Sequence, residues 1–179
     1  MSYCDYCAGK EDGDLNKIYH DTAYGFPIAN DNELFGRLIL EINQAGLSWS
    51  LMLKKENNFR LAFDNFNIER ISNYDDVKIS ELLENSGIIR NRLKINSVIY
   101  NAQKIISIQK EFGTFANWLD SQNPLSKEEW TKLFKKTFKF TGGEIVNEFL
   151  MSTGYLKGAH DESCTIFDKI LEHNPKWKI

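Results

Sequence analysis

Apolar side chains recur at intervals of three and four residues through most of this 179-residue chain, which is the spacing of one face of an α-helix. In the clearest case, Asp31 is placed to cap a helix that runs to Ala45, and Gly46 is placed to end it. Further helices are expected from Ser48 to Phe59, over about 79–85, between Gly87 and Gly113, over 115–119, after Ser126, over 145–153 and over 166–171. No segment alternates apolar and polar residues between hairpin turns. The sequence therefore predicts an all-α or mostly α fold.

The charge balance limits what the chain can bind through its overall field. Lys and Arg number 22 against 25 Asp and Glu, so the formal net charge is -3 and no whole-molecule basic field attracts nucleic acid or an anionic membrane. Any DNA contact must therefore be local. The chain has no basic-then-apolar leader and no run of about 18 apolar residues, so a cytoplasmic protein without membrane contact is expected.

Two cysteines and two histidines near the chain ends form a candidate metal site. Cys4 and His20 lie near one end and His160 and Cys164 near the other, and on a helix the last two would share a face. Together they offer the Cys₂His₂ set that zinc binds in a tetrahedron. The spacing leaves two alternatives open, which are buried thiols with ordinary imidazoles, or a site in which Cys7 replaces Cys4.

Basic residues follow a glycine at the predicted turn between two helices. Gly87 lies at the apex of this turn, and Arg90, Arg92 and Lys94 come after it. Free backbone N–H groups at the start of a helix favour an anion, and basic side chains add charge beside them. The arrangement resembles a helix-hairpin-helix that grips a DNA phosphate, which would let an acidic protein hold DNA. A plain helix-turn-helix with surface basic residues fits the same pattern.

One acidic residue interrupts a strongly apolar helix. Glu41 is flanked by Leu40 and Ile42, and a buried carboxylate is costly without a cationic partner. It either faces solvent on a wide apolar helix or lines a pocket for a positively charged ligand. Tyr19 and Trp49 are candidates for the walls of such a pocket, although aromatic residues are more often part of a core.

The stretch around this glutamate resembles the signature of the 3-methyladenine DNA glycosylase I family. It reads Leu-Glu-Ile-Asn-Gln-Ala-Gly-Leu-Ser-Trp over residues 40–49 and is followed by Leu53-Lys-Lys55 and Ala62-Phe63. Similar motifs occur in the family's order along the chain: Tyr19-His20-Asp21, Gly87 to Lys94, Phe138 to Gly142, and Gly154 to Cys164. The resemblance covers nearly the whole chain, from Cys4 to Cys164.

The resemblance implies a helix-hairpin-helix DNA glycosylase whose N- and C-terminal segments are joined by zinc. Cys4, His20, His160 and Cys164 match the family's ligands, which leaves Cys7 outside the site. Four protein ligands leave no open position for an activating water, so the single Zn²⁺ of each chain is expected to be structural.

The same resemblance assigns the other site residues. Glu41 matches the catalytic pocket carboxylate, and Tyr19 and Trp49 match the aromatic residues that contact the base. Tyr6 and Tyr24 stand where the family usually has Trp, and each keeps an aromatic face for the substrate. The DNA-binding hairpin corresponds to Gly87, Ile88, Arg90, Arg92 and Lys94.

The chain also departs from the family pattern near the pocket. Glu144 follows Gly143 where the family commonly has small hydroxyl-bearing residues or proline, so a second carboxylate is expected close to the pocket. The stretch from Trp118 to Lys132 is shorter than usual.

The domain organisation expected from the resemblance is a single glycosylase unit over 1–179. Its core, with the hairpin, is expected at about 31–135. The segments 1–30 and 136–179 are expected to form the zinc-clipped subdomain.

The implied activity is DNA repair, in which 3-methyladenine is flipped out of alkylated double-stranded DNA and excised by hydrolysis, leaving an abasic site. The family match supplies no lysine nucleophile, so a monofunctional enzyme without lyase chemistry is expected. Two alternatives are a zinc-stabilised helix-hairpin-helix module that binds DNA without cutting it, and an α-helical interaction protein that binds no DNA. A monomer without an obligate protein partner is expected.

Overall fold

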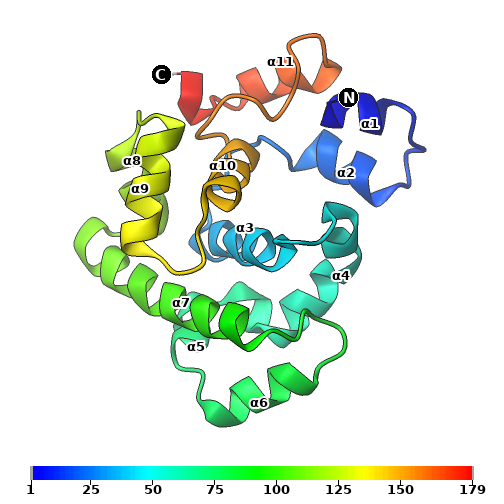
Figure 1. Ribbon diagram of the computed structural model, residues 1–179. Helices are drawn as coiled ribbons and strands as arrows, with labels where there is room; N and C mark the ends of the chain where they lie inside the picture. The colour runs from blue at the N-terminus through cyan, green and yellow to red at the C-terminus, as the bar shows by residue number, and fades with distance from the viewer. Residues whose placement is uncertain (1, 179) are drawn as a thin grey trace.

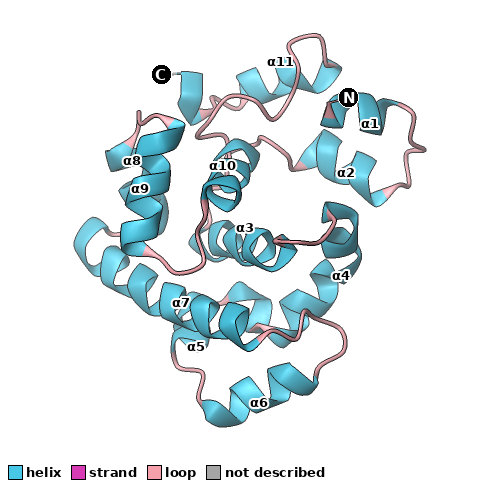
Figure 2. Cartoon of the chain, viewed as in Figure 1, coloured by secondary structure: helices cyan, strands magenta, loops and turns pink. Residues whose placement is uncertain are grey.

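The computed structural model describes residues 2–178, and these residues are helical, without a strand among them (Figures 1 and 2). The helices are α1 (Tyr3–Ala8), α2 (Leu15–Thr22), α3 (Asp31–Gln44), α4 (Trp49–Ala62), α5 (Ile68–Ser72), α6 (Asp76–Glu84), α7 (Arg92–Phe112), α8 (Phe115–Gln122), α9 (Lys127–Thr137), α10 (Gly143–Ser152) and α11 (Thr165–Glu172), with 3₁₀ helices η1 (Asp64–Phe66) and η2 (Lys176–Lys178). The predicted all-α fold is confirmed. None of the helices within 2–178 is both long and apolar enough to span a membrane.

Helix α3 lies at the centre of the molecule, with α4, α7, α8 and α10 packed around it (Figure 1). A helix that is apolar in nearly every direction is buried on all sides. This is the case for α3, where Leu34, Phe35, Leu38, Ile39 and Ile42 are fully buried. The central position of α3 carries Glu41, which belongs to the same helix, into the interior of the protein.

Side-chain caps determine where several helices begin. Ser48, Thr114 and Ser126 cap α4, α8 and α9 as predicted, and Ser126 forms a capping box with Glu129. In each case the side-chain oxygen accepts a hydrogen bond from one of the free backbone N–H groups of the first helical turn. These three beginnings could be read from the sequence because the cap is local.

Three other helices begin at residues that differ from those predicted. Asn30 rather than Asp31 caps α3. The Asp31 carboxylate instead accepts hydrogen bonds from backbone N–H groups at the start of α8. Helix α6 begins three residues earlier than predicted because Asp75 caps it. Helix α7 begins at residue 92, several residues after Gly87, because Asn91 provides its cap.

Helices α1, α2 and α5 were not predicted. Helices α1 and α5 have too few turns for an apolar period to be recognised, and the apolar residues of α2 are separated by polar and charged ones. Caps and packing stabilise them instead. Ser2 and Asp5 form a capping box on α1, Asp14 caps α2, and Asn67 caps α5.

The N-terminal helices α1 and α2 lie next to α11 and the loop before it (Figure 1). The Ser2 hydroxyl donates a hydrogen bond to the Asp161 carboxylate of that loop. Tyr19, Tyr24 and Ala159 form a small apolar cluster beside the main core, and Trp49 packs against both. The functional residues lie along the boundary between these two clusters.

Candidate active site and metal centre

A cavity of about 220 Å³ opens at the boundary between the two apolar clusters. Its walls come from α1, α2, α3, α4 and α10 and from the turn after α2, so segments far apart in the sequence meet here. The lining residues are Tyr3, Tyr19, Tyr24, Glu41, Gln44, Trp49 and Glu148. Aromatic rings with a few carboxylates are the lining expected of a site for a flat, positively charged ligand.

Glu41 lies in the cavity wall and not at the protein surface, with only 4% of the residue exposed. Burial raises the pKa of Glu41, Arg37 opposes this shift, and the Glu148 carboxylate adds to it, so that the pKa is about 8. An ionised carboxylate in a buried cavity is poorly stabilised when no ligand is bound. A cationic ligand would provide the opposite charge that it needs.

Arg37 is the basic residue of α3 and lies one turn before Glu41. Its guanidinium donates to the Tyr19 hydroxyl at 2.9 Å and to the Ser152 carbonyl at 3.3 Å. Because Arg can only donate, the Tyr19 oxygen accepts here and its own proton points elsewhere. Arg37 was not among the predicted site residues, although its i, i+4 spacing from Glu41 places the two side chains on the same face of the helix.

Aromatic rings form a continuous wall along the cavity. The ring centroids of Tyr19 and Trp49 are 5.1 Å apart, those of Tyr19 and Tyr24 are 5.5 Å apart, and those of Tyr3 and Tyr24 are 5.4 Å apart. Burial raises the pKa of Tyr19 and Tyr24, so both phenols stay neutral and can donate hydrogen bonds.

The structure corrects the placement of one predicted aromatic residue. Tyr6 does not line the cavity; it is 39% exposed, and the Lys10 ammonium lies 4.5 Å from its ring centroid. Tyr3, one turn earlier on α1, takes the position in the wall and stacks against Tyr6. The two residues share one face of a short helix, and only the tertiary position of α1 decides which of them reaches the cavity.

The second carboxylate of the cavity is also a different residue from the one expected. The Glu144 side chain is 87% exposed and forms an ion pair of 3.7 Å with Lys127, so it lies outside the cavity. Glu148, one turn later on α10, lines the cavity instead and accepts a hydrogen bond of 3.2 Å from the Tyr24 hydroxyl. It was missed although, like Glu41, it is an acidic residue within an apolar helix.

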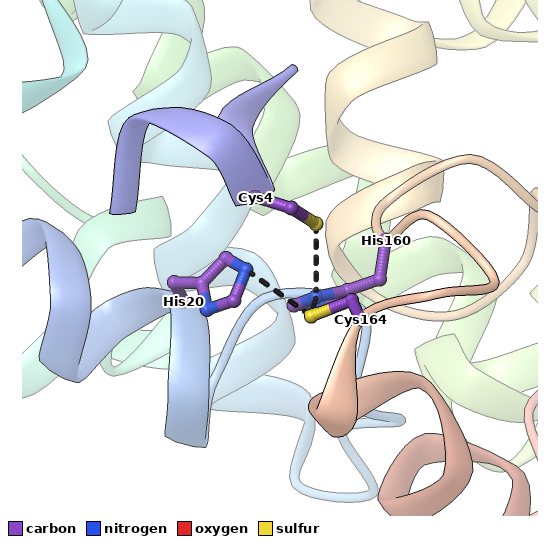
Figure 3. A group of neighbouring side chains, drawn as sticks. All are labelled: Cys4, His20, His160 and Cys164. Atoms are coloured by element: carbon purple, nitrogen blue, oxygen red, sulfur yellow. Dashed lines mark hydrogen bonds between the residues drawn. The ribbon is translucent and has the colours of Figure 1, made fainter. Parts of the chain in front are cut away.

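Cys4, His20, His160 and Cys164 come together as a group able to hold a metal ion (Figure 3). Their ligand atoms all lie within 4.8 Å of one another. The Cys164 sulfur is 3.6 Å from His160 Nδ1 and 3.8 Å from His20 Nε2, and the Cys4 sulfur is 3.7 Å from His160 Nδ1. Bond lengths of about 2.3 Å to sulfur and 2.0 Å to nitrogen give tetrahedral edges close to these separations.

Hydrogen bonds on the far side of each imidazole orient the cluster. His160 Nε2 lies 2.8 Å from the Tyr24 carbonyl, and His20 Nδ1 lies 2.7 Å from the Asp21 carboxylate. These contacts place a proton on the outer nitrogen and leave the inner nitrogen with a free lone pair, as metal-binding histidines require. Gly25 allows this packing, because a Cβ there would lie 2.9 Å from that of Ala159.

Two sequence-based interpretations of the cluster are resolved by its geometry. Cys7 lies outside it, fully buried, with its sulfur 3.6 Å from the Asn16 carbonyl, so Cys4 and not Cys7 belongs to the group. The expectation that His160 and Cys164 share a helix is wrong. His160 lies in the loop before α11, and Cys164 is the N-cap of that helix.

The basic segment between α6 and α7 is only partly exposed. Arg90 and Arg92 are exposed, whereas Ile88 is buried. Lys55 of α4 donates to the Gly87 carbonyl at 3.3 Å and ties the turn to the core. The surface that this segment offers to an anion therefore centres on two arginines.

Lys94 is a correction to the predicted DNA-binding set. Its residue is 5% exposed, and its ammonium donates to the carbonyls of Asn43 at 2.8 Å and Ala45 at 2.9 Å, at the end of α3. A cation at a helix C-terminus satisfies free carbonyls and interacts favourably with the helix dipole. Lys94 thus stabilises the end of α3 and the loop that leads to Trp49.

We expect a Lys94→Met variant to lose about 2 kcal/mol of unfolding free energy, because two charge-assisted hydrogen bonds disappear and buried carbonyls lose their donor. Urea denaturation measures the loss. Lys110→Met, an exposed change on the same helix, is the matched control and should leave the stability unchanged. Equal stability of the two variants would show that the bonds to α3 contribute nothing.

Comparison with known proteins relates the chain to DNA glycosylases. A family model described as methyladenine glycosylase matches residues 10–124. DNA-3-methyladenine glycosylase of Haemophilus influenzae is 30% identical over 155 residues, which cover 76% of this chain and 84% of that protein. DNA-3-methyladenine glycosylase 1 of Escherichia coli is 29% identical over 180 residues, which cover 90% of this chain and 96% of that protein.

A solved structure shares the same fold. The 3-methyladenine DNA glycosylase I of Staphylococcus aureus, described in terms of its 3-methyladenine recognition, matches with a TM-score of 0.80 at 27% identity. The match covers 92% of this chain and 97% of that one. The family model spans more than half of the chain, and the fold and the sequence relatives agree with it. This chain therefore belongs to the methyladenine glycosylase family.

Proposed function

We propose that this protein is a monofunctional DNA-3-methyladenine glycosylase, which flips the damaged nucleotide out of alkylated duplex DNA and hydrolyses its glycosidic bond. The observation that carries the proposal is the buried Glu41 carboxylate in a cavity walled by aromatic rings. The names of the bacterial relatives support the same activity. Base release from methylated duplex DNA is the direct test.

The chemistry of the substrate explains why such a cavity suffices. Alkylation at N3 gives adenine a positive charge and weakens its bond to the sugar, so little acid catalysis is needed. Flipping a damaged base out of the duplex costs a few kcal/mol, and stacking on an aromatic ring returns about 1–3 kcal/mol per base. Tyr19 and Trp49 are placed to provide that stacking.

Glu41 would select the base through its charge. A carboxylate about 4 Å from a cation gains about 1 kcal/mol in water and about 4 kcal/mol at an effective dielectric constant near 20. Neutral adenine gains none of this, so the normal base is rejected by charge as well as by shape. In this proposal Glu41 orients the cationic base, and water attacks the sugar once the glycosidic bond has loosened.

The pKa of Glu41 predicts how excision depends on pH. In the free protein the carboxyl is protonated below a pKa of about 8, and the cationic base favours the ionised form. We expect kcat/KM for 3-methyladenine release to rise with pH from 6, to reach half its maximum near pH 8 and to level off above about pH 9. A stopped assay across this range measures it. A flat profile would mean that ionisation of Glu41 is not needed.

The segment between α6 and α7 is proposed to bind the DNA backbone as a helix-hairpin-helix. Arg90 and Arg92 supply its exposed charges, next to the backbone around Gly87 and Ile88. We expect Arg90→Ala and Arg92→Ala each to weaken duplex binding regardless of base sequence and to reduce the slope of log K against log salt by about 1. Fluorescence polarisation measures this, with Lys110→Ala as the control. An unchanged slope in both variants contradicts the assignment.

The metal bound by the Cys₂His₂ group is proposed to be a structural Zn²⁺, because thiolate and imidazole ligands with tetrahedral spacing suit zinc. It would clip segments 1–30 and 136–179 into one subdomain beside the core at 31–135, in a monomer. Its contribution is rigidity, since four protein ligands leave no site for reacting water. The ligand residues also border the substrate cavity, because Tyr19 precedes His20 and the Tyr24 carbonyl contacts His160.

A second candidate function is a DNA-binding module that recognises the damaged base without cutting its bond. The observation that favours it is Glu148, which raises the pKa of Glu41 and so disfavours the ionised carboxylate. Tight binding of methylated duplex without release of base would support this candidate over the glycosylase.

A further inference from the structure

A second carboxylate faces the cavity, and the mechanism proposed above does not use it. Glu148 lies on α10, which packs against α3, the helix that carries Glu41. The Tyr24 hydroxyl donates to Glu148 Oε2 at 3.2 Å and holds the side chain in the wall. Two carboxylates from different helices are therefore presented to one cavity.

The surroundings of Glu148 place its side chain in the cavity wall and not on the outer surface. It is half-buried, whereas Glu144, one turn earlier on the same helix, is exposed and pairs with Lys127 of α9. Burial raises the pKa of Glu148, the Glu144 charge raises it slightly further, and both the Tyr24 hydrogen bond and the Lys127 charge oppose the shift. Glu148 in turn raises the pKa of Glu41.

Two like charges in one cavity repel each other, and each favours the protonated form of the other. A cation placed between them removes this repulsion and allows both to ionise, whereas a neutral ligand leaves the repulsion in place. The second carboxylate thus increases the difference in affinity between a cationic and a neutral ligand of the same shape.

We propose that Glu148 is a specificity-determining residue, whose carboxylate acts with that of Glu41 on the positive charge of the flipped base and strengthens the preference for a cationic N-alkylated purine over a neutral one. This inference rests on the proposed glycosylase function and deepens it. The substrate class it predicts is defined by a fixed positive charge on the base.

The charged and titratable groups around Glu41 determine the sign of the effect on pH dependence. Arg37 lies on its own helix, Tyr19 comes from α2, Tyr24 from the turn that follows, and Glu148 from α10. The two phenols stay neutral, Arg37 lowers the pKa of Glu41, and Glu148 raises it. Removal of the Glu148 charge therefore moves the pKa of Glu41 downward.

The test uses two competitive inhibitors of base release that differ only in charge. One is 3,9-dimethyladeninium, a fixed cation, and the other is its uncharged isostere with carbon in place of ring atom N3. The variant is Glu148→Gln, which keeps an oxygen acceptor for the Tyr24 hydroxyl. The matched control is Glu144→Gln, which removes the same charge from an exposed position on the same helix.

We expect Glu148→Gln to reduce the preference for the cation, expressed as the ratio of inhibition constants, by about tenfold. We also expect it to shift the rise of kcat/KM to lower pH by about one unit. Glu144→Gln should change neither quantity. Glu148→Asp, which keeps the charge, should restore much of the preference, and a purely structural role of Glu148 would not produce this rescue or the shift in pH.

An unchanged inhibitor ratio in Glu148→Gln, with wild-type protein that releases base, would overturn the assignment of Glu148 and leave the proposed function intact. Absence of base release by the wild-type protein would contradict the proposed function, and the inference would fall with it. If Glu148→Gln does not fold, Glu148→Ala removes the same charge from the cavity wall. A cation preference unchanged in that variant would also overturn the assignment.

Discussion

A Glu41→Gln variant is expected to release 3-methyladenine about 100-fold more slowly than the wild-type protein, because an amide of the same shape lacks the charge that faces the cationic base. The loss should appear mainly in kcat/KM for excision, measured in single-turnover assays on methylated duplex DNA. Duplex binding proposed for Arg90 and Arg92 should change little, since neither residue lines the cavity.

The same variant is expected to be more stable than the wild-type protein at neutral pH. The pKa of Glu41 is about 8 in the folded state against an ordinary value of 4.5. Between these values the folded protein binds a proton that the unfolded chain has lost, so the stability of the wild-type protein decreases as the pH rises. Gln remains neutral at every pH. The variant should therefore gain about 3 kcal/mol at pH 7 and almost nothing near pH 4.

Urea denaturation at several pH values checks this second expectation. Glu144→Gln, an exposed carboxylate with no role in the cavity, should leave excision unchanged and should show no comparable pH-dependent gain. Full activity of Glu41→Gln would remove Glu41 from base recognition. A stability difference that does not grow with pH would show that the carboxyl is not buried as its position in α3 indicates.

Removal of the metal is expected to destabilise the protein by about 4 kcal/mol, when the free metal concentration had been about 1,000 times the dissociation constant. One zinc ion per chain should be found by elemental analysis, and a strong chelator should lower the melting temperature. Excision should fall as well, because the two histidines help to position two residues of the cavity wall. His20 directly follows Tyr19 in the chain, and His160 is hydrogen-bonded to the Tyr24 carbonyl.

The ligand assignment is tested by two serine variants of similar size. Cys164→Ser should lose the zinc, melt at a lower temperature and no longer respond to chelator. Cys7→Ser lies outside the ligand group and should keep one zinc per chain and its response to chelator, although the buried hydroxyl will reduce stability somewhat. Retention of zinc by Cys164→Ser would contradict the assignment.

The helices and their ends could be predicted where the signal is local. The apolar period of α3 and the caps Ser48, Thr114 and Ser126 act over one or two turns, so the sequence alone reveals them. The short helix α1 lacks enough turns for a period, and its position depends on packing against α2. Tyr6 was placed at the substrate because it stands where the family usually has Trp, whereas the packing of α1 brings Tyr3 into the cavity wall.

The site shows the same division between local and tertiary signals. Glu41 stood out because a carboxylate within an apolar helix is unusual. Glu148 is also an acidic residue within an apolar helix, but the departure from the family pattern led to the prediction that Glu144 would be the second carboxylate near the cavity. Lys94 was assigned to DNA because it follows a glycine turn, and nothing in its neighbours in sequence indicates that it reaches the end of α3. The four residues of the Cys₂His₂ group were singled out by residue type; their spacing alone left Cys4 and Cys7 open, and the geometry agrees with the choice of Cys4 that the family resemblance implied.

The proposed activity depends on a buried carboxylate between aromatic rings that selects a cationic base for excision. The most direct measurement is incubation of the purified protein with methylated duplex DNA, followed by chromatography of the released bases and a count of abasic sites. We expect release of free 3-methyladenine with one abasic site for each base released, and no release from undamaged DNA. Retention of all the methylated base in the DNA, under conditions in which the protein binds the duplex, would contradict it.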